Sequence, residues 1–371
     1  MSHRRFKRLG GQSFFGDLVY EQAVPREHFL RQLDALVDWG AFTELLIQLY
    51  RGAGEVGRPP YEPAVILKVL VLSYLYALSE RQTEEFVNDS LSAKCFVGLA
   101  VDERGPDHST LTAFKGRIIA GGGQERLSQL LEEVVQQAQE RGVVFGTIQV
   151  VDSTHTVANV NVRKDDGRQG RGGKPPRDGG ARWGVKHTRR VRDEQGQVRE
   201  QKQYFYGYKA HTSLNAQAEM ITSVVVTGGN APDGKQFVRL VEHDRQQGVL
   251  AETYAGDRGY DDTENHYLLV HLGLHSAIKL NDYRTKKKDK NKQVWVALQA
   301  SPAYRLGQQE RYKIERKYGE AKVQHGLRRC RYLGWPRYAI QAYLTAIVLN
   351  LKRLVKLLTG VSFKGRAWIG A

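Results

Sequence analysis

Three acidic residues in separate parts of the chain could together form one metal site: Asp152, Asp257 and Glu315. The first two each end an apolar run that predicts a β-strand, and the third lies in a segment with a helical pattern. Rigidly held carboxylates that leave room for phosphate suit a two-metal phosphoryl-transfer site. Because the 371-residue chain has a formal net charge of +16, we expect that phosphate to belong to DNA.

Each acid also has an ordinary structural interpretation. Asp152 lies in an Asp-Ser-Thr sequence and could be a turn former at a strand end. Asp257 lies in Gly-Asp-Arg-Gly-Tyr, where the glycines allow a ligand to approach the backbone but also suit a turn. Asp261 and Asp262 compete for the same role, and Asp257 is preferred because the other two suit the start of a helix, with Asp261 and Glu264 as a capping box.

Glu315 is flanked by two cations along the predicted helix. Arg311 precedes it by four residues and Lys322 follows it by seven, which predicts that the three side chains share one face. A solvated salt-bridge face has the same pattern. Ile314 and Tyr318 indicate that this helix packs on a sheet, which favours a site in which the acid binds a metal and the cations bind phosphate oxygens.

Two basic segments are predicted to be loops. Residues 163–202 are rich in Gly, Arg and Lys and almost free of apolar residues, so we expect a mobile loop that contacts the DNA backbone; an inert solvated loop is the alternative. Residues 282–292 form a second basic run. Outside the Glu315 helix, the candidate phosphate-binding residues are Lys209, Arg258, Arg168, Arg171 and Lys174.

Histidines and tryptophans near these segments have less specific interpretations. The histidines are His155, His211 and His325. A magnesium site does not require histidine, so structural roles are expected for them. The tryptophans are Trp183, Trp295 and Trp335. They could stack on bases, although a packed aromatic side chain is the more common role.

Composition limits the class of protein. The length predicts two or three domains, and 41% hydrophobic residues are enough to build cores. The apolar run 64–78 is too short to span a membrane, and the run 338–358 contains charged residues, so both are expected to be buried helices. No signal peptide is expected. Cys95 and Cys330 fit reduced thiols in a cytosol.

The pattern of elements predicts an all-α part followed by an α/β part. Helices are predicted at 62–78, 80–88, 92–97, 109–119 and 124–141, with Ser79 and Asp107 or Ser109 as N-caps. Strands are predicted at 143–154, 204–212, 220–227, 252–256 and 276–280, and helices at 233–247, from 261 to about 272, and around Glu315. This order predicts a mixed five-stranded sheet that begins antiparallel and continues parallel, as in the ribonuclease-H-like fold.

The expected domains follow from the same pattern. They are a helical domain for DNA binding or assembly at 1–142, a catalytic domain at 143–358 and a tail at 359–371. The helical part 62–119 could include a helix-turn-helix reader of DNA.

Several motifs together resemble the DDE-type transposases of prokaryotic insertion sequences. They are Val-Val-Asp152-Ser-Thr, Gly-Tyr-Lys209-Ala-His211, Ala-Gly-Asp257-Arg-Gly-Tyr, and Arg311, Glu315 and Lys322 in the spacing R-x3-E-x6-K. Further similarity lies in Arg58-Pro-Pro-Tyr61, Asp107-His-Ser-Thr110 and the segment 350–354, so the resemblance covers roughly residues 55–357.

The resemblance implies a ribonuclease-H-like core in which Asp152, Asp257 and Glu315 hold two Mg²⁺ ions, with Mn²⁺ as a substitute. It implies nicking at the ends of an insertion sequence, then attack of the freed 3′-hydroxyl on target DNA. Double-stranded DNA is the expected partner, with a homodimer on DNA, no membrane, and a cytoplasmic, nucleoid-associated location.

The chain departs from the family pattern at one position. Some relatives have a tyrosine three residues before the arginine, where this chain has Gln308, and Tyr304 is displaced by one helical turn. A hairpin-ended intermediate is therefore not implied. Two alternatives to an active transposase remain: a domesticated metal-dependent nuclease on the same fold, and a DNA-binding repressor without catalysis.

Overall fold

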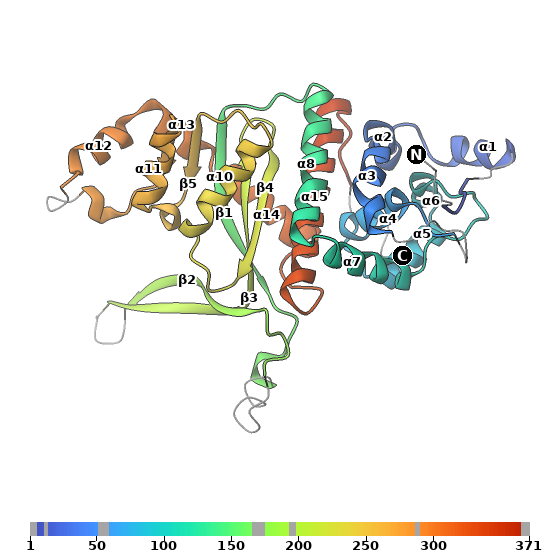
Figure 1. Cartoon of the computed structure of the whole chain (residues 1–371), viewed down its shortest axis with the longest axis horizontal. Helices are drawn as coiled ribbons and strands as arrows, with labels where there is room; N and C mark the ends of the chain where they lie inside the picture. Colours follow the sequence, from blue (N-terminus) through green and yellow to red (C-terminus); the bar gives the residue numbers. More distant parts are fainter. Residues whose placement is uncertain are drawn as a thin grey trace. The chain divides into compact units, whose positions relative to one another are not determined.

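The computed structural model describes residues 6–10, 14–50, 59–164, 175–192, 198–285 and 290–364. It contains two compact units, Met1–Val143 with Tyr343–Ala371, and Val144–Ala342. The first unit is helical and the second contains the sheet (Figure 1). The predicted phosphate-binding residues Arg168, Arg171 and Lys174 lie outside the described residues.

The helical unit forms around a central apolar helix, α4 (Pro63–Leu75). Nearly all of its residues are buried, because apolar side chains occur on every face. The surrounding helices are α1 (Phe14–Ala23), α2 (Phe29–Leu36), α3 (Trp39–Leu46), the 3₁₀ helix η1 (Ile47–Leu49), α5 (Glu80–Asp89), α6 (Leu91–Val97), α7 (His108–Ala120) and α8 (Gln124–Glu140). The long helix α15 (Trp335–Thr359) enters this unit at Tyr343.

Local sequence signals set the ends of these helices. Ser79 caps α5 through a capping box with Gln82, and the Asp107 carboxylate accepts a hydrogen bond from the backbone N–H of Thr110 at the start of α7. Both N-cap predictions are confirmed. Among the described residues, no single helix is long and apolar enough to cross a membrane; only α4 and α5 taken as a pair pass that test, and they bend by 106° at their break.

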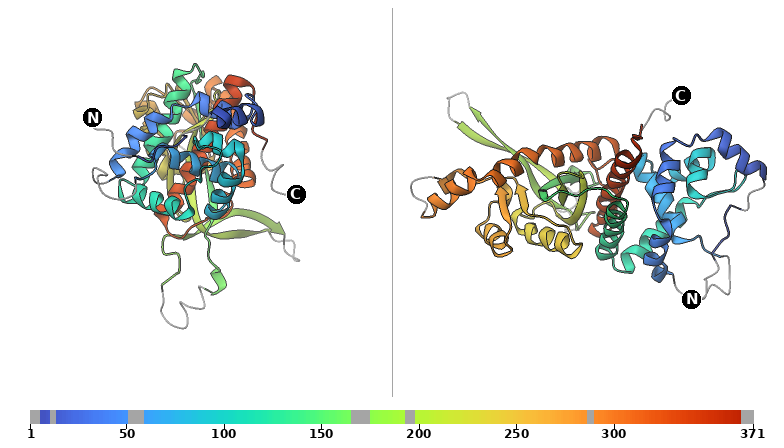
Figure 2. Two further views of the ribbon diagram at one scale, coloured as in Figure 1. Left: turned by 90° about the vertical axis from the view of Figure 1, so that its right-hand side faces the viewer. Right: turned by 90° about the horizontal axis from the view of Figure 1, so that it is seen from above.

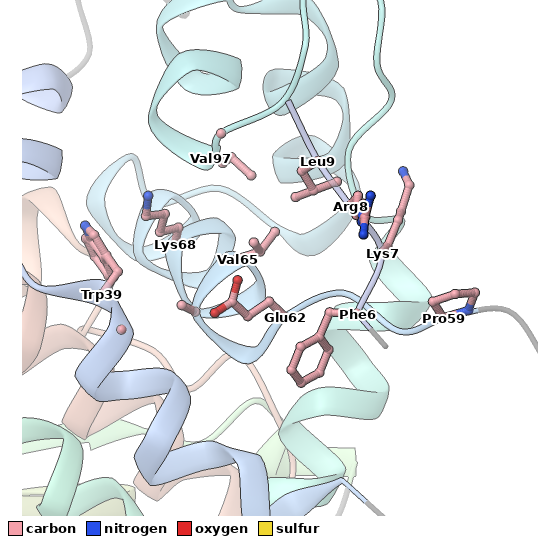
Figure 3. A pocket seen from close by; sticks show the side chains of 13 residues that line it. Phe6, Lys7, Arg8, Leu9, Trp39, Pro59, Glu62, Val65, Lys68 and Val97 are labelled. Carbon is pink, nitrogen blue, oxygen red and sulfur yellow. The ribbon is translucent and has the colours of Figure 1, made fainter. Parts of the chain in front are cut away.

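A cavity of about 960 Å³ opens in the helical unit beside α4 (Figure 3). Two of the cations that line it already have acidic partners: Lys68 Nζ lies 2.6 Å from Asp34 and Lys7 Nζ 2.8 Å from Glu103. None of the three predicted acids lines this cavity, so it is not the candidate active site.

The second unit is built on one mixed sheet. Its strands are β1 (Ile148–Val157), β2 (Arg182–Arg192), β3 (Val198–Asn215), β4 (Met220–Gly228), β5 (Thr253–Gly256) and β6 (His275–Ile278). The sheet order is β2-β3-β1-β5-β6, with β4 also paired to β3. β1 is antiparallel to β3 and parallel to β5, and β5 is parallel to β6. The central order β4-β3-β1-β5-β6 is that of the ribonuclease-H-like fold.

The five predicted strands are all present, but the loop prediction for 163–202 was wrong over its second half. Residues 182–192 form β2, and β3 begins at Val198 rather than near Tyr204. β4 pairs with β3 from Tyr208 onward, and β2 pairs with the preceding part of β3. The charged sequence concealed a two-stranded ribbon because strand pairing needs only backbone groups, not a buried apolar face.

Helices cover both faces of this sheet. On one face, Val151 packs in a buried cluster with Phe237 and Leu240 of α10 (Phe237–Gln246) and Leu269 of α11 (Thr263–His271). On the other, α13 (Pro302–Glu310) and α14 (Tyr312–Gln324) pack on β5, β6 and β1. The remaining helices are the 3₁₀ segments η2 (Gly234–Gln236), η3 (Arg258–Tyr260) and η4 (Asp282–Thr285), and α12 (Lys292–Ala300).

The predicted capping box at Asp261 is wrong. Asp262 caps α11 by accepting from the backbone N–H of Glu264. Asp261 is buried, and its carboxylate accepts from Arg284 Nε at 2.6 Å and lies 2.9 Å from His266 Nε2. Part of the second basic run is therefore a buried ion pair, because Arg284 is itself only 5% exposed.

Glycine is required at position 207, where β3 pairs with the end of β1. A Cβ at Gly207 would overlap the backbone carbonyl oxygen of Thr156, whereas a Cβ at Gly319 in α14 would meet nothing within 4 Å. We predict that Gly207→Ala lowers the free energy of unfolding by about 2–4 kcal/mol, because backbone must move. Gly319→Ala should be neutral or raise it by up to ~1 kcal/mol. Urea denaturation of both variants measures this, and equal effects would contradict it.

Candidate active site

The pairing of two parallel strands brings Asp152 and Asp257 together. In the register of β1 and β5, Val150 lies opposite Ala255, the last pair of the ladder. Asp152 and Asp257 each lie two residues beyond that pair, and their carboxylates interact electrostatically. Val150 and Ala255 are fully buried, which fixes this register. The parallel pairing therefore carries the two aspartates on neighbouring strands.

The charge of Asp257 perturbs Asp152. Burial, the larger cause, and repulsion from the Asp257 carboxylate together raise the pKa of Asp152 from 3.8 to about 7. The hydrogen bond from the Ser153 backbone N–H and the nearby Arg311 guanidinium offset only part of this effect. At neutral pH an aspartate with a pKa of about 7 is only half ionised, because its charged form is buried and close to a second carboxylate. A bound cation would offset this unfavourable negative charge.

The donor set fits a divalent metal in part. Asp152 and Asp257 supply hard carboxylate oxygens on rigid strands, and Asp257 Oδ1 is oriented by the backbone N–H of Gly259 at 2.8 Å. Within the described ranges, no three acidic, histidine or cysteine side chains lie close enough to share one ion. The pair is thus an incomplete ligand set that a third oxygen donor would complete.

Glu315 stands on the helix that packs over this pair, but its carboxylate is not gathered with the other two. Its side chain is 63% exposed, and its nearest cation is Arg311, with Nη2 3.8 Å from Oε1. One turn later on the same helix, the Tyr318 hydroxyl contacts Thr212 Oγ1 at 2.6 Å and donates to the backbone carbonyl of Asp152 at 2.7 Å. Tyr318 thereby fixes α14 on β1, with Glu315 one turn away.

Arg311 and Lys322 both interact electrostatically with Asp152. Arg311 lies at the junction of α13 and α14 with φ −59° and ψ −31°, so the helical spacing to Glu315 is kept. Its Nε is buried with no hydrogen-bond partner in the described part of the chain. Burial and Lys186 lower the pKa of Lys322, while Asp152 raises it. A buried unpaired donor and a desolvated ammonium group, both within electrostatic range of Asp152, are groups that phosphate oxygens would satisfy.

A fourth acid, Asp233, was missed by the sequence analysis. It ends the loop after β4, and its Oδ1 lies 2.8 Å from the Nζ of Lys209. A Cβ added to Gly259 would lie 3.0 Å from Asp257 Oδ1 and 3.6 Å from Asp233 Oδ2, so the two carboxylates flank one point. Asp233 also raises the pKa of Asp152. Sequence reasoning assigned Asp233 to a helix start, and it does precede the 3₁₀ helix η2, but nothing local indicated its contacts with Lys209.

Family models match both units of the chain. Residues 18–117 match a model described as Transposase domain (DUF772), and residues 146–351, more than half of the chain, match one described as Transposase DDE domain. The chain belongs to the DDE transposase family. The resemblance inferred from the motifs is confirmed, and the match to the DDE domain model spans residues 146–342 of the unit that contains Asp152 and Asp257.

Solved transposase structures resemble the chain only distantly. A piggyBac transposase synaptic complex with hairpin DNA is 10% identical, with 90% of this chain and 74% of that chain covered and a TM-score of 0.42. A Mos1 mariner paired-end complex with Mn is 12% identical, with 84% and 82% covered and a TM-score of 0.21. Likeness at this level says nothing about which residues act in this transposase.

Gln308 gives a structural reason for the transposase's departure from the family pattern. Its side-chain amide donates to the backbone carbonyls of Gly256, at 3.1 Å, and Ala277. Gln308 therefore ties α13 to the ends of β5 and β6, next to Asp257, in the position where some relatives carry tyrosine. A tyrosine lacks the amide N–H donors that make these two contacts.

The other predicted phosphate contacts that lie among the described residues, Lys209 and Arg258, are already partnered within the transposase. Lys209 donates to Asp233 and to the backbone carbonyl of Ala231 at 3.1 Å. Arg258 Nη2 lies 2.7 Å from Asp282 Oδ1, but this pair is exposed and therefore weak enough to exchange for a DNA phosphate.

The candidate histidines and tryptophans differ in how far their side chains are exposed to solvent. His211 and His325 are fully buried, burial lowers the pKa of His211 to about 4, and His155 packs on Phe205. Trp295 is buried against Arg284, and Trp335 donates to a backbone carbonyl of β4. Trp183, on β2, is 49% exposed.

The raised pKa of Asp152 predicts a pH-dependent cost to the metal-free fold. The protonated carboxyl contributes its full stability below about pH 4, and that stability is lost as pH rises through 7. Asp152→Asn should therefore raise the free energy of unfolding at pH 8 by up to roughly 4 kcal/mol, and by little at pH 4. Denaturation in EDTA at both pH values measures this.

The control for that measurement is Glu252→Gln, an exposed acid just before β5 at its opposite end. It should show no such trend. A difference between wild type and Asp152→Asn that is independent of pH would contradict the assignment, and added Mg²⁺ should reduce the difference at pH 8 by stabilising only the wild type.

The pair of Lys209 and Asp233 predicts strong energetic coupling. The two side chains are only 15% and 23% exposed, so Asp233→Ala should cost about 1–3 kcal/mol by leaving the ammonium group unpaired. A double-mutant cycle with Lys209→Met should recover at least ~1 kcal/mol. The exposed pair of Lys235 and Glu264 is the control, with coupling below about 0.5 kcal/mol. Equal coupling in both pairs would refute the buried interaction.

Proposed function

We propose that the chain is an active transposase that nicks the ends of its insertion sequence and joins the 3′-hydroxyl ends to target DNA. The observation that carries the proposal is the pair of facing aspartates, Asp152 and Asp257, beside two cations of α14. Family membership supports a transposase, and the acidic pair supports metal-dependent phosphoryl transfer.

Asp152, Asp257 and Glu315 would hold the divalent cations, Mg²⁺ or Mn²⁺. When bound there, such cations activate the attacking oxygen and stabilise the leaving oxygen of a phosphodiester. Within the described ranges, Arg311 is the one cation within 4 Å of the Glu315 carboxylate, at 3.8 Å, and the Glu315 side chain is 63% exposed. The carboxylate could therefore turn toward the pair at little cost and act as the third ligand.

The chain's own residues would position the DNA. Arg311 offers an unpaired buried Nε to a phosphate oxygen, and Lys322 offers an ammonium group on the same helix two turns beyond Glu315. Both interact electrostatically with Asp152, so a phosphate bound by them would lie close to the proposed metal ligands. Preorganised cations of this kind stabilise charge that develops on a phosphate during transfer.

The remaining parts of the proposal concern partners and place. The helical unit and the basic residues Arg258, Arg168, Arg171 and Lys174 would bind double-stranded DNA, and two copies would act together on two ends. The location would be the cytoplasm, on the nucleoid. The charge of +16 supports a polyanionic partner.

We predict that Asp152→Asn keeps DNA binding and lowers cutting by at least roughly 10²–10³-fold, because one ligand and its charge are lost while the cations of α14 remain. The substrate is a supercoiled plasmid that carries the genomic DNA flanking the gene, and nicking and joining are scored on gels with Mg²⁺ and with EDTA. Glu252→Gln is the matched control and should cut normally.

The outcomes separate the alternatives. Cutting by Asp152→Asn within a few-fold of wild type would defeat the assignment. Cutting by wild type without any joined product would favour a metal-dependent nuclease on this fold. Salt-dependent binding that ignores Mg²⁺, with no cutting by any variant, would favour a DNA-binding repressor.

A further inference from the structure

The ribbon formed by β2 and residues 198–207 of β3 extends from the sheet (Figure 1, Figure 2). One of its faces is aromatic and exposed. Trp183 lies opposite Tyr206 and Val185 opposite Tyr204, so these four side chains share a face. Trp183 is 49%, Val185 45% and Tyr204 58% exposed. We call this set the aromatic face. Large apolar side chains gathered in the open usually mark a binding surface.

The opposite face of the ribbon is anchored, which makes the aromatic face a rigid platform. Phe205 is buried and packs on His155 with ring centroids 4.8 Å apart. Gly184 lies so close to the backbone of Gly229 that a Cβ would overlap it. The Tyr206 hydroxyl donates to the backbone carbonyl of Asp178 at 2.7 Å. These contacts hold in place the part of the ribbon that carries Trp183, so its side chain stays exposed.

Cations surround the aromatic face and connect it to the acidic pair. Lys186 sits at a bulge in β2, between Val185 and His187, and Lys202 is exposed on the facing part of β3. Lys186 acts electrostatically on Lys322, as does Arg328, and Lys322 in turn senses Asp152. In the described part of the chain, none of these four cations has an ion-pair partner. The ribbon near Lys186 and Lys202 is thus positively charged, and Lys322 lies within electrostatic range of both Lys186 and Asp152.

We propose that the aromatic face stacks on unpaired bases of the DNA strand beside the acidic pair, while Lys186, Lys202 and Lys322 bind its phosphates. Alternating aromatic and cationic side chains match single-stranded DNA, because every base presents a flat face and every nucleotide a charge. Paired bases are stacked on each other and offer no free face to Trp183 or Tyr204. A second copy of the ribbon fits less well, since its lysines would meet the same lysines.

This inference rests on the proposed function, because it places single-stranded DNA at the same site. The test uses oligothymidylate of about 20 nucleotides and a blunt duplex of about 20 base pairs, each labelled with fluorescein, in EDTA. Fluorescence anisotropy gives the affinities of wild type, Trp183→Ala, Tyr204→Ala and Trp183→Phe. Tyr267→Ala, which removes a 63% exposed tyrosine on α11, is the control.

Trp183→Ala and Tyr204→Ala should each weaken binding of oligothymidylate by about tenfold and of duplex by less than about twofold. Trp183→Phe should retain most of the affinity, and Tyr267→Ala all of it. Unchanged oligothymidylate affinity, or an equal loss for both DNAs, would overturn the proposal. So would a loss of self-association in sedimentation without any change in DNA binding, which would make the face a contact between copies.

The failures of the two proposals are distinguishable. Binding in EDTA does not depend on cutting, so a protein that stacks on oligothymidylate but never nicks DNA contradicts only the transposase mechanism. A protein that nicks normally after Trp183→Ala, with unchanged oligothymidylate affinity, contradicts only the role of the ribbon. Thermal melting of each variant excludes loss of fold, and the conservative Trp183→Phe separates stacking from packing.

Discussion

The parallel pairing of β1 with β5 is the constraint on which the candidate site depends. It carries Asp152 and Asp257 on neighbouring strands, where their carboxylates repel and Asp152 is partly buried. The sheet does not relieve that repulsion by itself, and Arg311 and Lys322 supply compensating positive charge. Buried apolar neighbours hold the register, so the fold maintains an unfavourable arrangement of charge that a bound cation would make favourable.

The helix α14 is positioned by contacts that are independent of those charges. Tyr318 bonds to the backbone of Asp152 and to Thr212, and Gln308 at the end of α13 bonds to the ends of β5 and β6. Glu315 lies on this fixed helix, but its side chain is largely exposed. Under the proposed function, an exposed Glu315 side chain on a fixed helix would turn toward an ion while the acidic pair stays in place.

The sequence predicted the sheet because apolar periodicity is a local signal. It placed both aspartates at strand ends, which holds for Asp257 after β5, but Asp152 lies within β1, which continues to Val157. It did not predict β2, since a ribbon rich in Arg and Lys has no buried face to produce alternation. It also missed Asp233, which reaches Lys209 and the vicinity of Asp257 only through the return of the chain after β4. Residues brought together by tertiary contacts at loops leave no periodic trace.

The same reasoning explains why the basic segment was misjudged. A run of like charges repels itself and usually stays unfolded, unless backbone pairing or a partner compensates. Here pairing with β3 orders the ribbon base, but the exposed lysines and the aromatic face still lack any compensation within the described chain. A surface that is ordered, positive and aromatic is difficult to explain by stability alone, because burying Trp183 or pairing Lys186 would both stabilise the fold. Its arrangement is instead the one expected of a surface whose partner carries both flat rings and negative charge.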